Sequence, residues 1–433
     1  MEFQTLKKSH LKRNIIIGIL VVGIISACIL TFTRAKYKNT QSIPLVTGTI
    51  NYSLADLNIV AIKVDGKEVE TIPEGNYELT GESYCTVNGE KDESMKLSYD
   101  STTRGLSVTP MTAKGTKCYL DFKERLCPDG AEACEIILAN KEIKKRELPL
   151  TTSSTVEGDT TGKIYKAEDD WGDTYYFAGN PSDNWLYFAG YYWRIIRING
   201  DGSIRVIYNG SSINTTGTGT QIQTSGFGFN SYQSEYLGYM YTLGQQHGNT
   251  SNSPIKLVID KWYNSNLASY EDKISTEVGF CGDREMASGS SWSSTGSHNY
   301  AAYERLTVNS NSVNPTFKCS NSNDLYTTSS SSKGNKALTN PIGLITADEV
   351  IMAGLPWSGS IVNNYLYTNQ YYWTMTPYIL ASDGWSYMFL VEPNGQLDCD
   401  YVNYDRGVRP VINLAYDVVI KSGNGTSSTP YEI

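Results

Sequence analysis

Residues 371–414 read YYWTMTPYILASDGWSYMFLVEPNGQLDCDYVNYDRGVRPVINL, and this stretch carries the strongest structural signal in the chain. Its runs of β-branched and aromatic residues predict four strands, at Tyr372–Thr376, Trp385–Val391, Gln396–Val402 and Val408–Leu414. Between the second and third runs, Glu392-Pro393-Asn394-Gly395 predicts a β-turn with proline at its second position. We therefore expect an antiparallel meander with aromatic and polar side chains on one face.

Upstream of this stretch, local patterns predict one hairpin and two helices. Two β-rich runs flank Asn199-Gly200-Asp201-Gly202-Ser203, which is a strong hairpin signal. The Asn-x-Asp-x-Ser spacing also resembles the start of a calcium loop, but Ile204 and Gly210 stand where that loop needs Gly and Glu. One helix should begin at Pro254 with Ser253 as its N-cap. The other should begin at Thr346, which forms a capping box with Glu349.

Residues 47–124 predict a small all-β domain of the sandwich kind. Its strand candidates are short and separated by turn residues, at Asn58–Val64, Gly75–Leu79, Met95–Tyr99, Gly105–Thr109 and Thr116–Phe122. The domain carries no chemical motif, so we interpret it as a spacer. Residues 125–160 are then expected to form a junction, and residues 421–433 a flexible tail.

The N-terminus predicts the location of the chain. Residues 15–32 contain no charge and would span roughly 27 Å as a helix, about the hydrocarbon thickness of a bilayer. Because Lys7, Lys8, Lys12 and Arg13 precede this run, residues 1–14 should form a cytoplasmic tail, and 15–33 a single-pass anchor. A tether at 34–46 would then leave the body outside the cell. Two alternatives remain open, which are lipidation at Cys28 and cleavage as a signal peptide.

Cysteine usage also favours an oxidising exterior. Seven cysteines lie beyond the predicted anchor, and we predict the local pairs Cys85–Cys118, Cys127–Cys134 and Cys281–Cys319. Cys399 is then left unpaired. No C-x-x-C motif occurs, and the three histidines are scattered, so the sequence gives no metal site.

The composition of the chain limits the classes of partner that it can bind. The chain has 433 residues and a net charge of -9, while its first 36 residues carry +5, so the remainder is acidic. An acidic body does not fit a binder of nucleic-acid backbones. The chain holds 32 Tyr and 10 Phe. Tyr, Ser, Gly and Asn are favoured in binding surfaces that must stay soluble, although an AT-rich genome would also enrich Tyr and Asn.

Several segments together resemble a known family. Leu344–Ala353 resembles the helix start of the formylglycine-generating-enzyme branch of the C-type-lectin fold, and Gly407–Val411 resembles its closing strand. Three segments are similar to the repeated signature of bacterial surface proteins with a domain of unknown function of this fold: Tyr191–Arg194, Tyr371–Thr376 and Gly407–Leu414. The resemblance spans most of residues 161–420. It implies an α+β, C-type-lectin-like domain with a twisted antiparallel sheet and two helices. We therefore expect this domain to follow the small all-β domain and one transmembrane helix that the residues predict.

The same fold occurs in the variable proteins of diversity-generating retroelements, which mutate adenines, typically in Asn codons. Eight residues here are reachable from an Asn codon in that way: Asp398, Cys399, Asp400, Tyr401, Asn403, Tyr404, Asp405 and Arg406. Leu397, Val402 and Gly407–Arg409 would be framework. The alternative is chance, because the whole chain is rich in Asp, Tyr and Asn.

These observations predict a membrane-anchored, adhesin-like or receptor-like protein that binds a protein or glycan, with no cofactor and no catalytic residue. The predicted binding face consists of eleven residues: Asp383, Trp385, Tyr387, Asp398, Cys399, Asp400, Tyr401, Asn403, Tyr404, Asp405 and Arg406. Glu392-Pro393-Asn394 matches a calcium tripeptide of animal lectins, but its companion Trp-Asn-Asp is missing, so we interpret it as a turn. An extracellular enzyme of the same fold and a purely structural surface protein are the alternatives. Cys399 lacks the partner thiol that the enzymatic branch needs.

Overall fold

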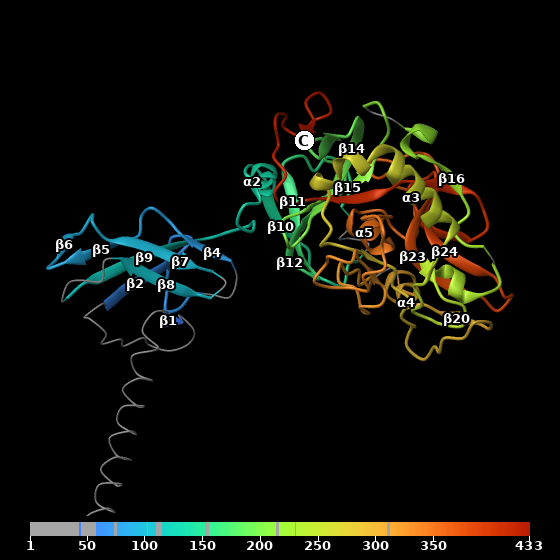
Figure 1. Cartoon of the computed structure of the whole chain (residues 1–433), viewed down its shortest axis with the longest axis horizontal. Helices are drawn as coiled ribbons and strands as arrows, with labels where there is room; N and C mark the ends of the chain where they lie inside the picture. The colour runs from blue at the N-terminus through green and yellow to red at the C-terminus, as the bar shows by residue number, and fades with distance from the viewer. Residues whose placement is uncertain are drawn as a thin grey trace, which may run out of the picture. The chain divides into compact units, whose positions relative to one another are not determined.

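The computed structural model describes residues 43–44, 58–72, 76–101, 103–109, 115–151, 156–213, 216–229, 231–309 and 312–433. The chain divides into two compact units, Met1–Leu126 and Cys127–Ile433 (Figure 1). Strands account for 35% of the described residues and helices for 13%.

This sheet-dominated architecture corrects the predicted α+β class with its transmembrane helix. The helical signals were read correctly, but they cover short segments, and the Tyr-, Ser- and Thr-rich sequence between them forms strands and turns. Across the described ranges, no helix has the length and apolar character needed to cross a membrane. The anchor predicted at 15–33, the basic tail at 1–14, Cys28 and most of the tether at 34–46 lie outside those ranges.

The first unit contains two sheets with a common core. Its strands are β1 (Ile43–Pro44), β2 (Asn58–Val64), β3 (Lys67–Val69), β4 (Tyr77–Leu79), β5 (Tyr84–Val87), β6 (Glu90–Lys91), β7 (Lys96–Asp100), β8 (Gly105–Thr109) and β9 (Lys117–Glu124). The larger sheet has the order β3-β2-β9-β5-β6 with β4 on β9, and the smaller has the order β1-β8-β7. Ile62, Leu106, Val108, Leu120 and Phe122 form much of the buried core. Each of the five strands predicted here has a counterpart in these sheets.

A nine-stranded sheet organises the second unit. Its main path follows the order β10-β11-β12-β14-β15-β27-β22, and β13 pairs with both β14 and β28. The strands are β10 (Glu142–Lys145), β11 (Lys163–Asp169), β12 (Gly172–Tyr176), β13 (Trp185–Phe188), β14 (Tyr191–Ile198), β15 (Ile204–Tyr208), β22 (Ile342–Gly343), β27 (Val411–Leu414) and β28 (Tyr431–Glu432). The hairpin predicted around Asn199–Ser203 is confirmed, because β14 and β15 pair antiparallel across it.

Two of the expected linker segments take part in this sheet. Strand β10 belongs to the predicted junction at 125–160 and pairs in parallel with β11. Strand β28 belongs to the predicted tail at 421–433 and pairs in parallel with β13, where Tyr431 is buried.

A six-stranded sheet holds most of the C-terminal stretch. It has the order β16-β26-β23-β24-β25, with β20 on β23. The strands are β16 (Gln223–Ser225), β20 (His298–Asn299), β23 (Tyr372–Leu380), β24 (Ser386–Val391), β25 (Leu397–Tyr401) and β26 (Arg406–Val408). Two small ladders complete the unit, β17 (Met240–Tyr241) with β18 (Ser251–Asn252) and β19 (Phe280–Cys281) with β21 (Leu325–Tyr326).

The fourth predicted strand of the meander does not stay in this sheet. Strands β23, β24 and β25 form the expected antiparallel meander, but β27 pairs with β15 in the other sheet. The chain changes sheets at Arg409-Pro410, where proline offers no N–H to continue a ladder. The buried Arg409 guanidinium donates to Tyr208 O, Leu366 O and Asn209 Oδ1, which fixes this crossing.

The helices are α2 (Glu132–Leu138), α3 (Pro254–Asn266), α4 (Ala301–Thr307) and α5 (Ala347–Met352). Both predicted N-caps are confirmed, because Ser253 Oγ accepts from Lys256 N and Thr346 Oγ1 accepts from Glu349 N. All six residues of α5 are buried, and this helix lies inside the second unit (Figure 1).

The structure confirms the three predicted disulfides, Cys85–Cys118, Cys127–Cys134 and Cys281–Cys319, with Cys399 free. Cys85 and Cys118 are directly opposite each other on β5 and β9. Three disulfides fit an oxidising environment.

Candidate functional site

The predicted binding residues gather on β24, β25 and the turns beside them. Tyr387 is opposite Tyr401, Phe389 is opposite Cys399, and Met388 is opposite Asp400. Directly opposed residues share a face of a sheet, and neighbours along a strand alternate between faces. The ladder therefore places Tyr387, Cys399 and Tyr401 on one face, and Asp398 and Asp400 on the other.

Aromatic rings form a continuous band across the first face. We call this the aromatic band, and it consists of Trp357, Tyr378, Trp385, Tyr387, Tyr401, Tyr404 and Tyr232. The ring centroids of Tyr387 and Tyr401 are 4.5 Å apart, and those of Trp385 and Tyr401 are 4.8 Å apart. Tyr404 follows at 5.3 Å from Tyr401. Separations of this size are those of interacting aromatic pairs.

One end of the band is exposed to solvent, and the other end is a stacked pair of rings. Tyr404 is 44% exposed and Tyr232 is 50% exposed, while Trp385, Tyr387 and Tyr401 are partly buried. Tyr232 lies 4.6 Å from Trp385, and Trp357 stacks on Tyr378 at 5.3 Å. The tyrosines at the centre of the prediction are thus outside the packed interior.

Sequence reasoning missed three members of the band. Tyr232 precedes the short helical turn η3 (Ser234–Leu237), Trp357 follows α5, and Tyr378 is on β23. They come from segments far apart in the sequence, and their local patterns resemble those of other tyrosines in the chain. Tyr378 lies where β23 shifts register against β24, with Ile379 opposite Tyr387, so alternation does not predict its face. Only the folded chain brings Tyr232, Trp357 and Tyr378 to the band.

The predicted framework residues form the support under the band. Leu397, Val402, Val408 and Arg409 are buried, while Asn403, Tyr404 and Asp405 between them are exposed. Gly395 enters the turn before β25 with a φ of +84°, and a Cβ there would lie 1.9 Å from Ile361 O. Exposed side chains are therefore carried on a closely packed backbone.

Asp398 and Asp400 cap the free edge of the sheet. Val402 N donates to Ser386 O at 3.2 Å, so alternation turns the amides of Cys399 and Tyr401 away from β24. Those two outward amides donate to the side chains of the preceding residues, Cys399 N to Asp398 Oδ1 at 2.8 Å and Tyr401 N to Asp400 Oδ1 at 2.9 Å. Strand β25 is the last of its sheet, and such edges invite pairing with another chain.

Negative charge collects beside the band. Asp400 Oδ2 accepts from Arg406 Nε at 2.8 Å, and the Arg406 guanidinium lies 4.3 Å from the centre of the Tyr371 ring. Asp398 is opposite Leu390, so it lies with Glu392 on the face of the sheet away from the band, and burial together with the charge of Asp398 raises the pKa of Glu392 above its ordinary value. Asp383 and Asp405 are exposed, and Asp383 Oδ1 accepts from Trp385 N.

Cys399 has the properties of an unreactive thiol. Burial raises its pKa far above the ordinary value, and Asp398 and Asp400 raise it further. Because the thiolate is the nucleophile, this surrounding suppresses thiol chemistry.

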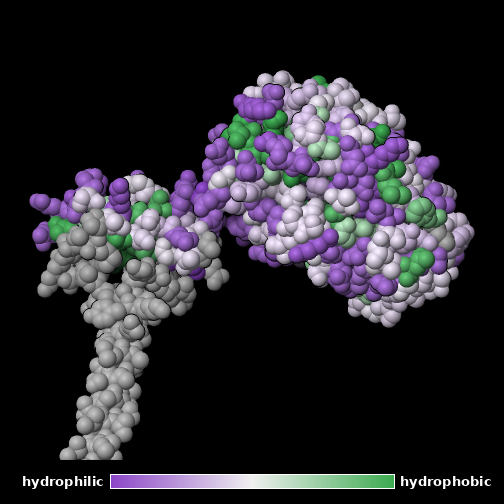
Figure 2. Space-filling view, viewed as in Figure 1, coloured by the Kyte–Doolittle hydropathy of each residue, from purple (hydrophilic) through white to green (hydrophobic). Residues whose placement is uncertain are grey.

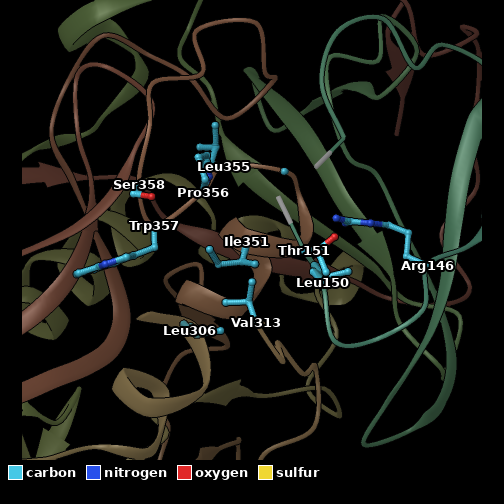
Figure 3. A pocket seen from close by; sticks show the side chains of 11 residues that line it. Arg146, Leu150, Thr151, Leu306, Val313, Ile351, Leu355, Pro356, Trp357 and Ser358 are labelled. Carbon is cyan, nitrogen blue, oxygen red and sulfur yellow. The ribbon is translucent and has the colours of Figure 1, made fainter. Parts of the chain in front are cut away.

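An apolar pocket opens at the Trp357 end of the band (Figure 3). Its water-accessible space is about 60 Å³, and it opens to solvent. Arg146 lies across the pocket from Trp357, and the aliphatic side chains of Leu306, Val313 and Ile351 lie together below Pro356 in this view (Figure 3). On the face of the second unit that Figure 2 shows, hydrophobic residues form small, separate patches.

The Glu392–Gly395 segment forms the predicted turn, since Gly395 N donates to Glu392 O and Glu392 N to Gln396 O. In the part of the chain that the structure describes, no group of three His, Cys, Asp or Glu side chains is arranged to hold a metal ion.

The chain matches no family model, no curated protein and no solved structure. The resemblance to the formylglycine-generating-enzyme branch therefore stays a prediction from the sequence.

Proposed function

We propose that this chain is an extracellular binding protein of the adhesin or receptor kind, whose second unit presents the aromatic band to a protein or glycan. The observation that carries the proposal is the band itself, in which rings from separate segments meet on a partly exposed sheet face. Tyrosine and tryptophan offer large contact areas at low cost in conformational entropy, and tyrosine adds a hydroxyl. A buried framework beneath them limits the ordering that binding would require.

An extracellular location is supported by the three disulfides. Attachment to the cell membrane, expected from residues 15–33, has the sequence alone as its support. The raised pKa of Cys399 weighs against a thiol-dependent enzyme at this site.

The experiment compares the wild-type chain with the double variant Tyr401→Ala/Tyr404→Ala on a glycan array and a peptide array. We expect the variant to lose at least about tenfold in affinity for any probe that the wild type binds, because two central rings are removed. The melting temperature should stay within a few degrees. Tyr416→Ala is the matched control, since Tyr416 is 46% exposed and does not belong to the band.

Two results would contradict the proposal. Absence of binding to both arrays by the wild type would favour a purely structural surface protein. A large drop in melting temperature would mean that Tyr401 and Tyr404 serve the core instead of a ligand.

A further inference from the structure

The walls of the pocket beside Trp357 are aliphatic. Leu150, Leu306, Ile351 and Leu355 are buried side chains that line it, and Val313 adds a partly buried wall. Arg146 lies at the side, where its Nη1 donates to Met352 O at 2.9 Å. A hollow of this composition favours an apolar group, because few of its surfaces can replace the hydrogen bonds that a sugar hydroxyl makes with water.

Trp357 joins this pocket to the aromatic band. Its ring stacks on Tyr378 with an interplanar angle of 25° and lies 5.6 Å from the Phe389 ring. Backbone bonds hold the segment against β25, since Leu397 N donates to Pro356 O at 2.8 Å and Gln396 Nε2 donates to Trp357 O at 2.9 Å. A ligand that fills the pocket therefore contacts the same ring that begins the band.

Charge beside the band favours a cationic partner. Asp383 accepts from the backbone N–H of Trp385, a member of the band, and Asp405 follows Tyr404; both aspartates are exposed. Arg406 is the cation of this group, and Asp400 already accepts from it. Carboxylates attract Lys and Arg, and the faces of Tyr and Trp rings add cation–π attraction.

Resting on the proposed function, we propose that the pocket beside Trp357 is the anchoring subsite of the binding face, and that the ligand is a polypeptide segment. One aliphatic or aromatic side chain of this segment enters the pocket, and flanking Lys or Arg residues lie over the acidic, aromatic surface. Apolar walls and acidic surroundings together fit this ligand better than a glycan, which would have neither an anchor for the pocket nor a positive charge.

The test uses the full chain and synthetic peptides with lysine flanks and a central Leu, Phe, Ser or Ala. A second set carries glutamate flanks. We expect the Leu or Phe peptide to bind about tenfold more tightly than the Ser and Ala peptides, and the glutamate-flanked set to bind weakly. Titration followed by tryptophan fluorescence and by calorimetry measures both effects.

Two kinds of variant distinguish the contribution of the pocket to binding from that of the carboxylates. Val313→Phe should fill the pocket and remove the preference for Leu and Phe, and Ser358→Trp, at the exposed rim, is a second pocket variant if the first unfolds. Asp383→Asn/Asp405→Asn should weaken the binding of lysine-flanked peptides several-fold and reduce the salt dependence of binding. Asn at 383 keeps an oxygen that can accept from Trp385 N.

Equal binding of all central residues, or unchanged preference in both pocket variants, would overturn the inference, as would no peptide binding at millimolar concentration. If a glycan binds instead and Tyr401→Ala/Tyr404→Ala abolishes it, the proposed function survives and the peptide anchor does not. If neither class of probe binds, both fail.

Discussion

Tyr387 and Tyr401 face each other across the β24–β25 ladder, with their ring centroids 4.5 Å apart. Cross-strand aromatic pairs stabilise a sheet by roughly 0.2–1 kcal/mol each. This pair also fixes the place of Tyr401 relative to the interior of the sheet, although Tyr401 ends an edge strand. A ligand would therefore meet rings whose positions are already set, which lowers the entropic cost of binding.

The capped edge of β25 leads to a prediction about self-association. Asp398→Ala/Asp400→Ala removes the side-chain acceptors from the outward amides of Cys399 and Tyr401. An uncapped edge strand is a template for pairing with a second chain. We expect the variant to form larger species than wild type, measured by sedimentation velocity over a concentration series.

Asp398→Asn/Asp400→Asn is the control for this experiment, because asparagine keeps an acceptor while the charge is lost. It should sediment like wild type. If the alanine variant also does so, the aspartates do not protect the edge.

A buried ion cluster around Glu349 should support the second unit. Glu349 lies 3.2 Å from Arg197 Nε and 2.5 Å from Arg205 Nε, and Arg197 also pairs with Asp169. Glu349→Gln leaves two buried guanidinium groups short of a counter-charge, which costs about 3–5 kcal/mol for comparable buried pairs. Glu168→Gln is the control, because Glu168 pairs with Lys318 at the surface and should cost less than about 1 kcal/mol. Denaturant unfolding of both variants measures the difference, and equal losses would contradict it.

Histidine 298 should make the fold sensitive to mild acid. The residue is 4% exposed, neither ring nitrogen has a hydrogen-bond partner among the described residues, and burial lowers its pKa from the ordinary value near 6.5. The unfolded chain then binds a proton before the folded one does. Stability is therefore complete above the unfolded pKa and declines as pH falls below about 6.5.

His298→Leu tests this directly. Because the imidazole makes no hydrogen bond within the described chain, we expect stability at pH 7.5 to change little. Between pH 6.5 and 5 the variant should lose less stability than wild type, measured by thermal unfolding across pH. If the stabilities of the two proteins fall in parallel between pH 6.5 and 5, a group other than His298 causes the loss.

Much of the local structure could be predicted. The cap at Thr346, the start of α3 at Ser253 and the Asn199–Ser203 hairpin each depend on residues a few positions apart, so the signal and the structure occupy the same segment. The cysteine pairs were also predicted, because each joins near neighbours in the sequence. The overall class was wrong, because α+β was taken from the family resemblance, whereas the long Tyr- and Ser-rich sequence forms strands and the helices are short.

The arrangement of the candidate binding residues was harder to predict, for a related reason. Alternation along β25 was not applied to the run from Asp398 to Arg406, so residues on two faces of the sheet were assigned to one surface. Trp357 and Tyr232 lie outside that run, and no local pattern connects them with Tyr401.

The amino-acid sequence by itself determined the strands, turns, helix caps and disulfide pairs, because short-range sterics, hydrogen bonds and chain entropy act between nearby residues. Tertiary structure alone decided that β27 leaves the meander at Pro410 and that Trp357, Tyr378 and Tyr401 share one surface. Those contacts depend on how two sheets bury their apolar faces against each other, which is a property of the whole unit and of no single segment.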